Sequence, residues 1–117
     1  MDRIAQRTKN DCLRCAVAMA TNQPYEDVPN FVEVSPSSWS GALRDWLSNR
    51  GLGFVRIGID LEEPPEGVPL IGIGKGRLAC MHAVVFHAVV EIDPAPSALG
   101  LLGAPKHLLA ILPLATE

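Results

Sequence analysis

The spacing of apolar residues changes near Gly53, and this change constrains the fold more than any other feature of the sequence. Before it, apolar residues over 39–50 recur at the spacing of one helix face, and Gly51 can end that helix. After it come short apolar runs typical of strands, at 54–57, 68–73, 81–86, 89–92 and 108–112. Helices followed by strands predict an α+β fold with a mostly antiparallel sheet.

The chain has 117 residues, of which 48% are hydrophobic, so we expect a single domain over residues 1–117. Its net charge is −3 and its basic residues are scattered, which does not favour nucleic-acid binding. No apolar run approaches the ~20 residues of a membrane span, and no apolar signal segment is present, so no membrane association is expected. Three cysteines, an odd number, favour the cytoplasm over a disulfide framework.

Cys12 stands at the predicted beginning of an Ala-rich buried helix over residues 12–21, which Asn10 or Asp11 can cap. Free backbone N–H groups and the positive end of the helix dipole stabilise a thiolate at such a position. We therefore interpret Cys12 as a nucleophile. A small apolar residue at the beginning of a core helix is the plainer interpretation.

A predicted hairpin brings a histidine and a carboxylate together. With His87 at the exposed tip of a tight turn, Val85 would pair with Val90 and His82 with Asp93. Directly opposed residues point to the same face, with Cβ atoms about 4.5–5.5 Å apart. An imidazole oriented by a carboxylate is the base of a catalytic triad. The plainer interpretation is a surface salt bridge at the end of a hairpin.

Gln6 lies six residues before Cys12, where its amide can donate to an oxyanion alongside the Cys12 backbone N–H. Several short motifs then occur in a fixed order: Gln6, Asp11-Cys12, Ala18-Met19, His82-Ala83-Val84-Val85 and Asp93-Pro94. This ordered set resembles the bacteriocin-leader-processing, double-glycine cysteine peptidases, which are papain-like enzymes. The chain is also similar to small uncharacterised phage and bacterial proteins with the same motif set.

The resemblance implies a papain-like fold and a thiol hydrolase, either a peptidase or an isopeptidase or amidase. Such an enzyme would act on a peptide or protein substrate and would need neither a cofactor nor a metal. Cys12 would be the nucleophile, His82 the base, Asp93 the orienting carboxylate and Gln6 the oxyanion donor. The family usually has Gly after the nucleophile, whereas this chain has Leu13, so we expect Leu13 to narrow the substrate cleft.

A glycine-rich loop follows the strand predicted over 68–73. It lacks the Gly-Lys-Ser/Thr ending of a phosphate-binding loop. We expect it to line the cleft near His82, with Lys75 and Gly76 contacting the substrate and Lys75 or Arg77 meeting an acidic group.

Three other interpretations remain open. Cys12, Cys15, Cys80 and His82 are four plausible ligands of a structural zinc site. Cys12 and Cys15 have the spacing of a thioredoxin-type redox pair. A papain-like domain that no longer turns over could also serve as a catalytically inactive binding module.

Overall fold

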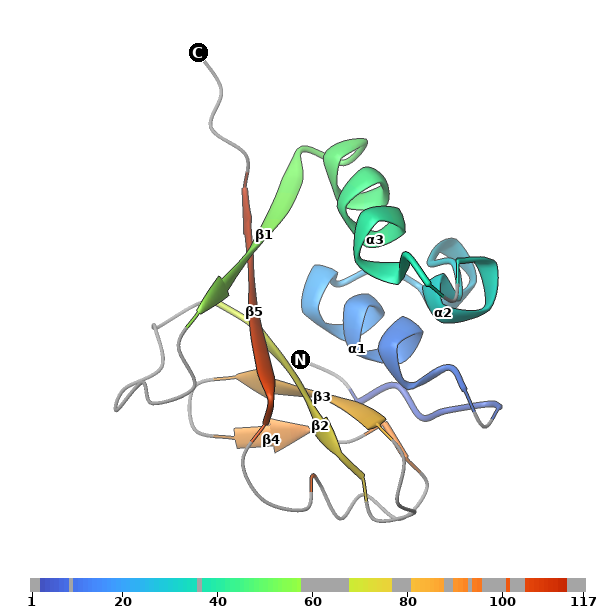
Figure 1. Cartoon of the computed structure of the whole chain (residues 1–117), viewed down its shortest axis with the longest axis vertical. Coiled ribbons are helices and arrows are strands. Elements are labelled where there is room, and N and C mark those ends of the chain that lie inside the picture. Colours follow the sequence, from blue (N-terminus) through green and yellow to red (C-terminus); the bar gives the residue numbers. More distant parts are fainter. Residues whose placement is uncertain are drawn as a thin grey trace.

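The computed structural model describes residues 3–8, 10–35, 37–57, 68–76, 81–87, 90–92, 94–95, 101 and 105–113. It confirms an α+β fold, in which helices from the first half of the chain pack on one face of an antiparallel sheet (Figure 1). None of the helices within these residues is long and apolar enough to cross a membrane.

The helical elements of the described residues are α1 (Cys12–Thr21), the 3₁₀ turn η1 (Tyr25–Asp27), α2 (Phe31–Val34) and α3 (Trp39–Ser48). The strands are β1 (Leu52–Ile57), β2 (Leu70–Lys75), β3 (Met81–His87), β4 (Val90–Ile92) and β5 (His107–Pro113). They lie in the order β1-β5-β2-β3-β4, and each described pairing is antiparallel.

Local backbone chemistry sets the ends of the two longer helices. α1 ends at Asn22, which adopts a left-handed conformation with φ 55° and donates its backbone N–H to the Met19 carbonyl oxygen. After α3, Gly51 has φ 72°, a conformation that favours glycine, and the chain then enters β1. The helix predicted over 12–21 is therefore confirmed, whereas the helix predicted to run to Gly51 ends at Ser48, and Gly51 instead turns the chain into β1.

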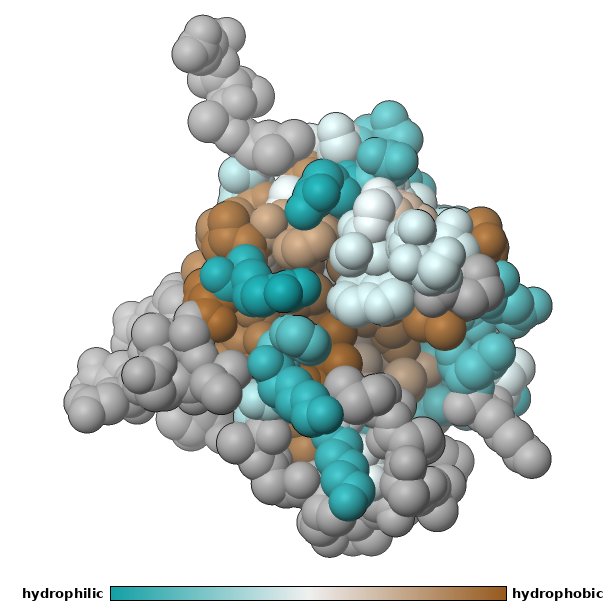
Figure 2. All heavy atoms as spheres, viewed as in Figure 1, coloured by the Kyte–Doolittle hydropathy of each residue, from teal (hydrophilic) through white to brown (hydrophobic). Residues whose placement is uncertain are grey.

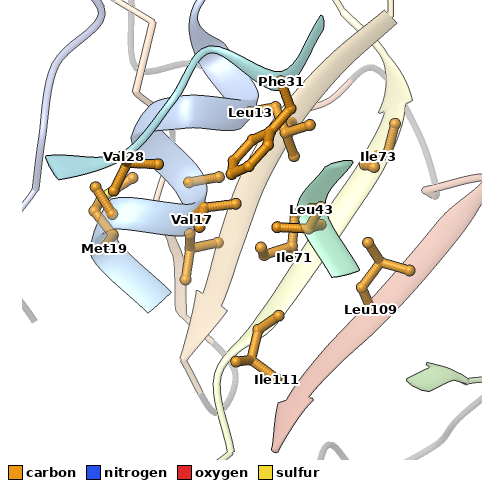
Figure 3. Close-up of a cluster of buried hydrophobic side chains, with 14 of the residues drawn as sticks. Leu13, Val17, Met19, Val28, Phe31, Leu43, Ile71, Ile73, Leu109 and Ile111 are labelled. Atoms are coloured by element: carbon orange, nitrogen blue, oxygen red, sulfur yellow. The ribbon is translucent and has the colours of Figure 1, made fainter. Parts of the chain in front are cut away.

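A cluster of buried apolar side chains joins α1, α2 and α3 to the sheet (Figure 3). Its buried members from β2, β3 and β5 are Ile71, Ile73, Ala83, Val85, Leu109 and Ile111. They alternate along their strands and so point to one face, here called the helix-facing side. Full burial of one such large side chain contributes about 1.5–3 kcal/mol, so this cluster holds the helices in place.

The opposite face of the central strands is also covered. Leu70, Val84 and Ala110 are buried, yet they alternate with the cluster residues and lie outside the cluster. β1 is less buried than β2 and β5, and its Val55 is 48% exposed. Figure 2 shows hydrophobic residues at the surface over β1 and β5, crossed by hydrophilic ones.

The register predicted for the β3–β4 hairpin is wrong by two residues. Val85 pairs with Ile92, and His87 pairs with Val90 instead of lying at the tip of the turn. The reason is that β3 continues through His87, so only residues 88–89, outside the described part, connect the two strands. A shift of two residues keeps every side chain on its predicted face. The predicted register, in which His82 would pair with Asp93, is however not the one that forms, so cross-strand pairing no longer supports contact between these two residues.

We predict that Gly72→Ala destabilises the protein. An added Cβ would overlap Cε2 of Phe86 and lie 3.1 Å from its Cδ2, and overpacking costs about 1–3 kcal/mol. Gly41→Ala is the control, because nothing lies within 4 Å of its added Cβ and Ala favours a helix over Gly by about 0.5–1 kcal/mol.

Urea unfolding of both variants measures the change in the free energy of unfolding. Replacing Phe86 with Leu should relieve most of the Gly72→Ala penalty. Equal stability of wild type and Gly72→Ala would contradict the packing of the Phe86 ring on Gly72.

Candidate active site

Cys12 is the first residue of α1, and its side chain is half-buried and packs against the core cluster, whereas residues 15–19 of the same helix are buried. Asp11 precedes the helix as expected of a capping residue, but its side chain makes no capping hydrogen bond. That part of the prediction is wrong, because the Asp11 carboxylate is occupied elsewhere. The first backbone N–H groups of α1 are therefore not occupied by this side chain and can meet an anion near Cys12.

The Asp11 carboxylate is fully buried and accepts hydrogen bonds from four groups. Oδ2 accepts from the Tyr25 hydroxyl at 2.7 Å and from the Arg7 backbone N–H at 3.0 Å. Oδ1 accepts from Nε2 of Gln6 at 3.3 Å, and the Thr8 backbone N–H is the fourth donor. Burial alone would raise the pKa of Asp11, but the four hydrogen bonds together lower it below its usual value. The carboxylate is therefore charged at neutral pH.

Tyr25 is held from several sides. The guanidinium carbons of Arg7 and Arg14 lie 4.0 and 3.9 Å from the centroid of its ring. Nε of Arg14 also donates to the Tyr25 carbonyl oxygen at 3.1 Å, and Arg7 forms an exposed ion pair with Glu26 at 3.1 Å. The hydrogen bond to Asp11 and burial both raise the pKa of Tyr25, so its hydroxyl remains a donor at neutral pH.

Gln6 is placed through both its backbone and its side chain. Its backbone N–H donates to the Pro94 carbonyl oxygen at 2.7 Å, and the Arg3 guanidinium donates to the neighbouring carbonyl of Ala95. Its amide Nε2 donates to Oδ1 of Asp11 and to the Thr8 carbonyl oxygen at 3.2 Å. The structure thus brings Gln6, the residue before Cys12 and the residue after Asp93 to one place.

His82 is the second residue of β3 and is half-buried. α1 packs on β3, and Figure 1 shows the beginning of β3 beneath the beginning of α1. Ala83 and Val85 point to the helix-facing side, so regular alternation assigns His82 to the opposite face.

Lys75 and Gly76 lie close to His82 along the ladder. His82 pairs with Gly74, Lys75 is the exposed last residue of β2, and Gly76 is buried directly after it. Lys75 therefore belongs to the strand and not to the predicted loop, whereas a cleft near His82 and contact of Lys75 or Gly76 with a substrate stay predictions. Asp93, Cys80 and Arg77 lie outside the described residues.

Leu13 corrects one expectation. Its side chain is 4% exposed and belongs to the core cluster, near Phe31 in Figure 3. α1 turns Leu13 toward the core, while the half-buried Cys12 lies at the beginning of the helix. Leu13 is therefore a core residue and does not narrow a cleft beside the thiol.

His107 was not considered from the sequence. It begins β5 and pairs with Ile73, which in turn pairs with Ala83 of β3, so His107 lies at the same end of the sheet as His82. Alternation with Leu109 assigns it to the helix-facing side. The signal was present, because His107 precedes an apolar strand just as His82 does.

Comparison of the chain with protein-family models, with curated proteins and with solved structures finds no match. Within the described residues, no group of three or more His, Cys, Asp or Glu side chains could hold a metal ion. What the site can do must therefore follow from its own residues.

We predict that iodoacetamide modifies Cys12 and spares Cys15 in the folded protein. Cys15 is fully buried, and burial together with the nearby Asp11 charge raises its pKa to about 12. At pH 8 only about one Cys15 thiol in 10⁴ would then be the reactive thiolate. Peptide mass spectrometry measures modification at each cysteine, with urea-unfolded protein as the control in which both react. Equal rates at the two cysteines in folded protein would contradict the burial of Cys15.

Proposed function

We propose that the chain is a thiol hydrolase with a papain-like arrangement of its site residues. Cys12 would be the nucleophile, His82 the base, Asp93 the orienting carboxylate and Gln6 an oxyanion donor. One observation supports this above all. Gln6 hydrogen bonds both to Asp11, the residue before the half-buried Cys12, and to Pro94, which is distant in the sequence and directly follows Asp93.

The reaction would cleave a peptide or isopeptide bond in two steps. The Cys12 thiolate attacks the carbonyl carbon, and the oxyanion that forms accepts hydrogen bonds from Gln6 and from the Cys12 backbone N–H. His82, protonated by the thiol, gives that proton to the leaving amine, and a thioester remains on Cys12. Water deprotonated by His82 then hydrolyses the thioester, which releases the acid and restores the thiol.

The position of Leu13 supports activity. A bulky residue after the nucleophile would obstruct an approaching carbonyl only if its side chain lay in the cleft. Because Leu13 lies in the core, it leaves the surface beside Cys12 unobstructed. Lys75, exposed at the end of β2, could still meet an acidic group of the substrate.

A catalytically inactive papain-like binding module is the second candidate. The alternation of side chains along β3 favours this candidate. Ala83 and Val85 point to the helix-facing side, which assigns His82 to the opposite face. A histidine that remained on that face would not activate Cys12. The two candidates therefore differ in whether the reactivity of Cys12 depends on His82.

The zinc and redox interpretations are less well supported. Both require Cys15 to be accessible, either to a metal ion or to a disulfide partner. Cys15 is fully buried in α1, which opposes both roles, and its raised pKa further opposes thiol–disulfide exchange.

We predict that His82→Ala slows the reaction of Cys12 with p-nitrophenyl acetate by about 10²-fold or more, because a general base contributes about 10²–10⁴-fold. His107→Ala is the matched control and should retain the wild-type rate within about threefold. Cys12→Ala should abolish turnover, whereas Cys15→Ala should retain it. Release of p-nitrophenol measures the rate, and intact mass identifies an acetylated intermediate.

Two results would reject the hydrolase. If His107→Ala slowed the reaction with p-nitrophenyl acetate and His82→Ala did not, the assignment of His82 as the base would be wrong. If Cys12 were acetylated once, without turnover and regardless of His82, the binding module would replace the enzyme.

A further inference from the structure

We propose that Asp11 is a positioning residue that fixes which end of the Gln6 amide faces the site, and that Tyr25 holds Asp11 in place for this purpose. The inference rests on the proposed function, since it concerns the oxyanion donor of that reaction. Asp11 is a buried carboxylate that takes no part in the reaction steps described above.

The hydrogen bonds of Asp11 are directed away from its own helix. An aspartate before a helix usually accepts from backbone N–H groups of the first turn. Asp11 accepts instead from the backbone of Arg7 and Thr8 and from the side chain of Gln6, all in the preceding segment. That segment contains neither helix nor strand among its described residues, so the carboxylate is what fastens it to the beginning of α1.

Tyr25 follows α1 in the sequence and is the hydrogen-bond partner of Asp11 on that side of the helix. Its hydroxyl donates to Oδ2 of Asp11 at 2.7 Å, and the side chains of both residues are buried. Its ring contacts the guanidinium groups of Arg7 and Arg14, whose central carbons lie 4.0 and 3.9 Å from the ring centroid. Because Arg7 belongs to the segment that carries Gln6, a displacement of Tyr25 would disturb that segment.

The chemistry of a carboxylate explains why this contact orients the amide. An ionised Asp11 only accepts hydrogen bonds, so it pairs with the nitrogen end of the Gln6 amide and not with the oxygen end. The amide nitrogen carries two hydrogens, and the second now points to the Thr8 carbonyl oxygen at 3.2 Å. When an oxyanion forms, that hydrogen can turn to it while Asp11 retains the first.

Asp11→Asn tests this orientation with almost no change of size. An asparagine both donates and accepts, so it permits the flipped Gln6 amide, whose oxygen would repel an oxyanion. Two probes separate this effect from general damage. Acetylglycinal forms a thiohemiacetal whose oxygen needs the donor, whereas alkylation by iodoacetamide develops no such oxyanion.

We expect Asp11→Asn to weaken acetylglycinal binding about 10- to 100-fold, measured as protection of Cys12 from iodoacetamide, since losing one oxyanion donor costs about 10²–10³ in rate. The alkylation rate without aldehyde should stay within about threefold. Gln6→Ala should cause the same loss, and adding Asp11→Asn to it should cause no further loss, because Asp11 acts through Gln6. Thr21→Val, which removes a hydrogen bond at the far end of α1, is the control and should bind the aldehyde as wild type does.

Tyr25→Phe keeps the carboxylate and removes only the hydroxyl. It decides the matter if Asp11→Asn does not fold, and it should weaken aldehyde binding about three- to tenfold. Additive losses in the double variant, or aldehyde binding sensitive to Gln6→Ala but not to Asp11→Asn or Tyr25→Phe, would overturn this inference alone. Failure of the wild type to bind the aldehyde at Cys12 would overturn the proposed function, and this inference with it.

Discussion

The buried charge of Asp11 is the constraint on which the arrangement of the site depends. A carboxylate removed from water is costly unless donors surround it, and here four groups donate to it. Three of these donors belong to residues 6–8 and the fourth is the Tyr25 hydroxyl, so satisfying one charge fixes both flanking segments against α1. Residues 6–8 are polar and offer little apolar surface for packing, so these hydrogen bonds are what hold them against α1.

The core supplies the second half of the arrangement. α1 packs on β2 and β3 through its buried residues, whereas the half-buried Cys12 lies at the beginning of the helix. Two thiols three residues apart thereby acquire different chemistry. Cys15 is fully buried in the core, and burial keeps its thiol protonated, whereas Cys12 is only partly buried. The same helix turns Leu13 into the core, so Leu13 contributes to packing while Cys12 is left for chemistry.

Periodicity made the fold class, the helix over 12–21 and the positions of the strands predictable, because helix faces and strand faces repeat at different spacings. The hairpin register was not predictable, since a shift of two residues leaves the pattern of Val85, Val90 and Ile92 unchanged. The bonds from Gln6 and Tyr25 to Asp11 were also not predictable. They depend on how an irregular segment folds back, and a lone tyrosine after a helix carries no signal of a carboxylate partner.

The proposed function requires Cys12 and His82 to share one site, and the imidazole resonances of the histidines test this requirement most directly. Two-dimensional ¹H–¹³C spectra report each Cε1–H group of His82, His87 and His107 before and after carboxamidomethylation of Cys12, in a Cys80→Ser variant so that Cys12 is the target. If the two residues share a site, the resonance of His82 should shift most and that of His107 should stay unchanged. A shift at His107 with none at His82, or no shift at any histidine, would contradict a shared site.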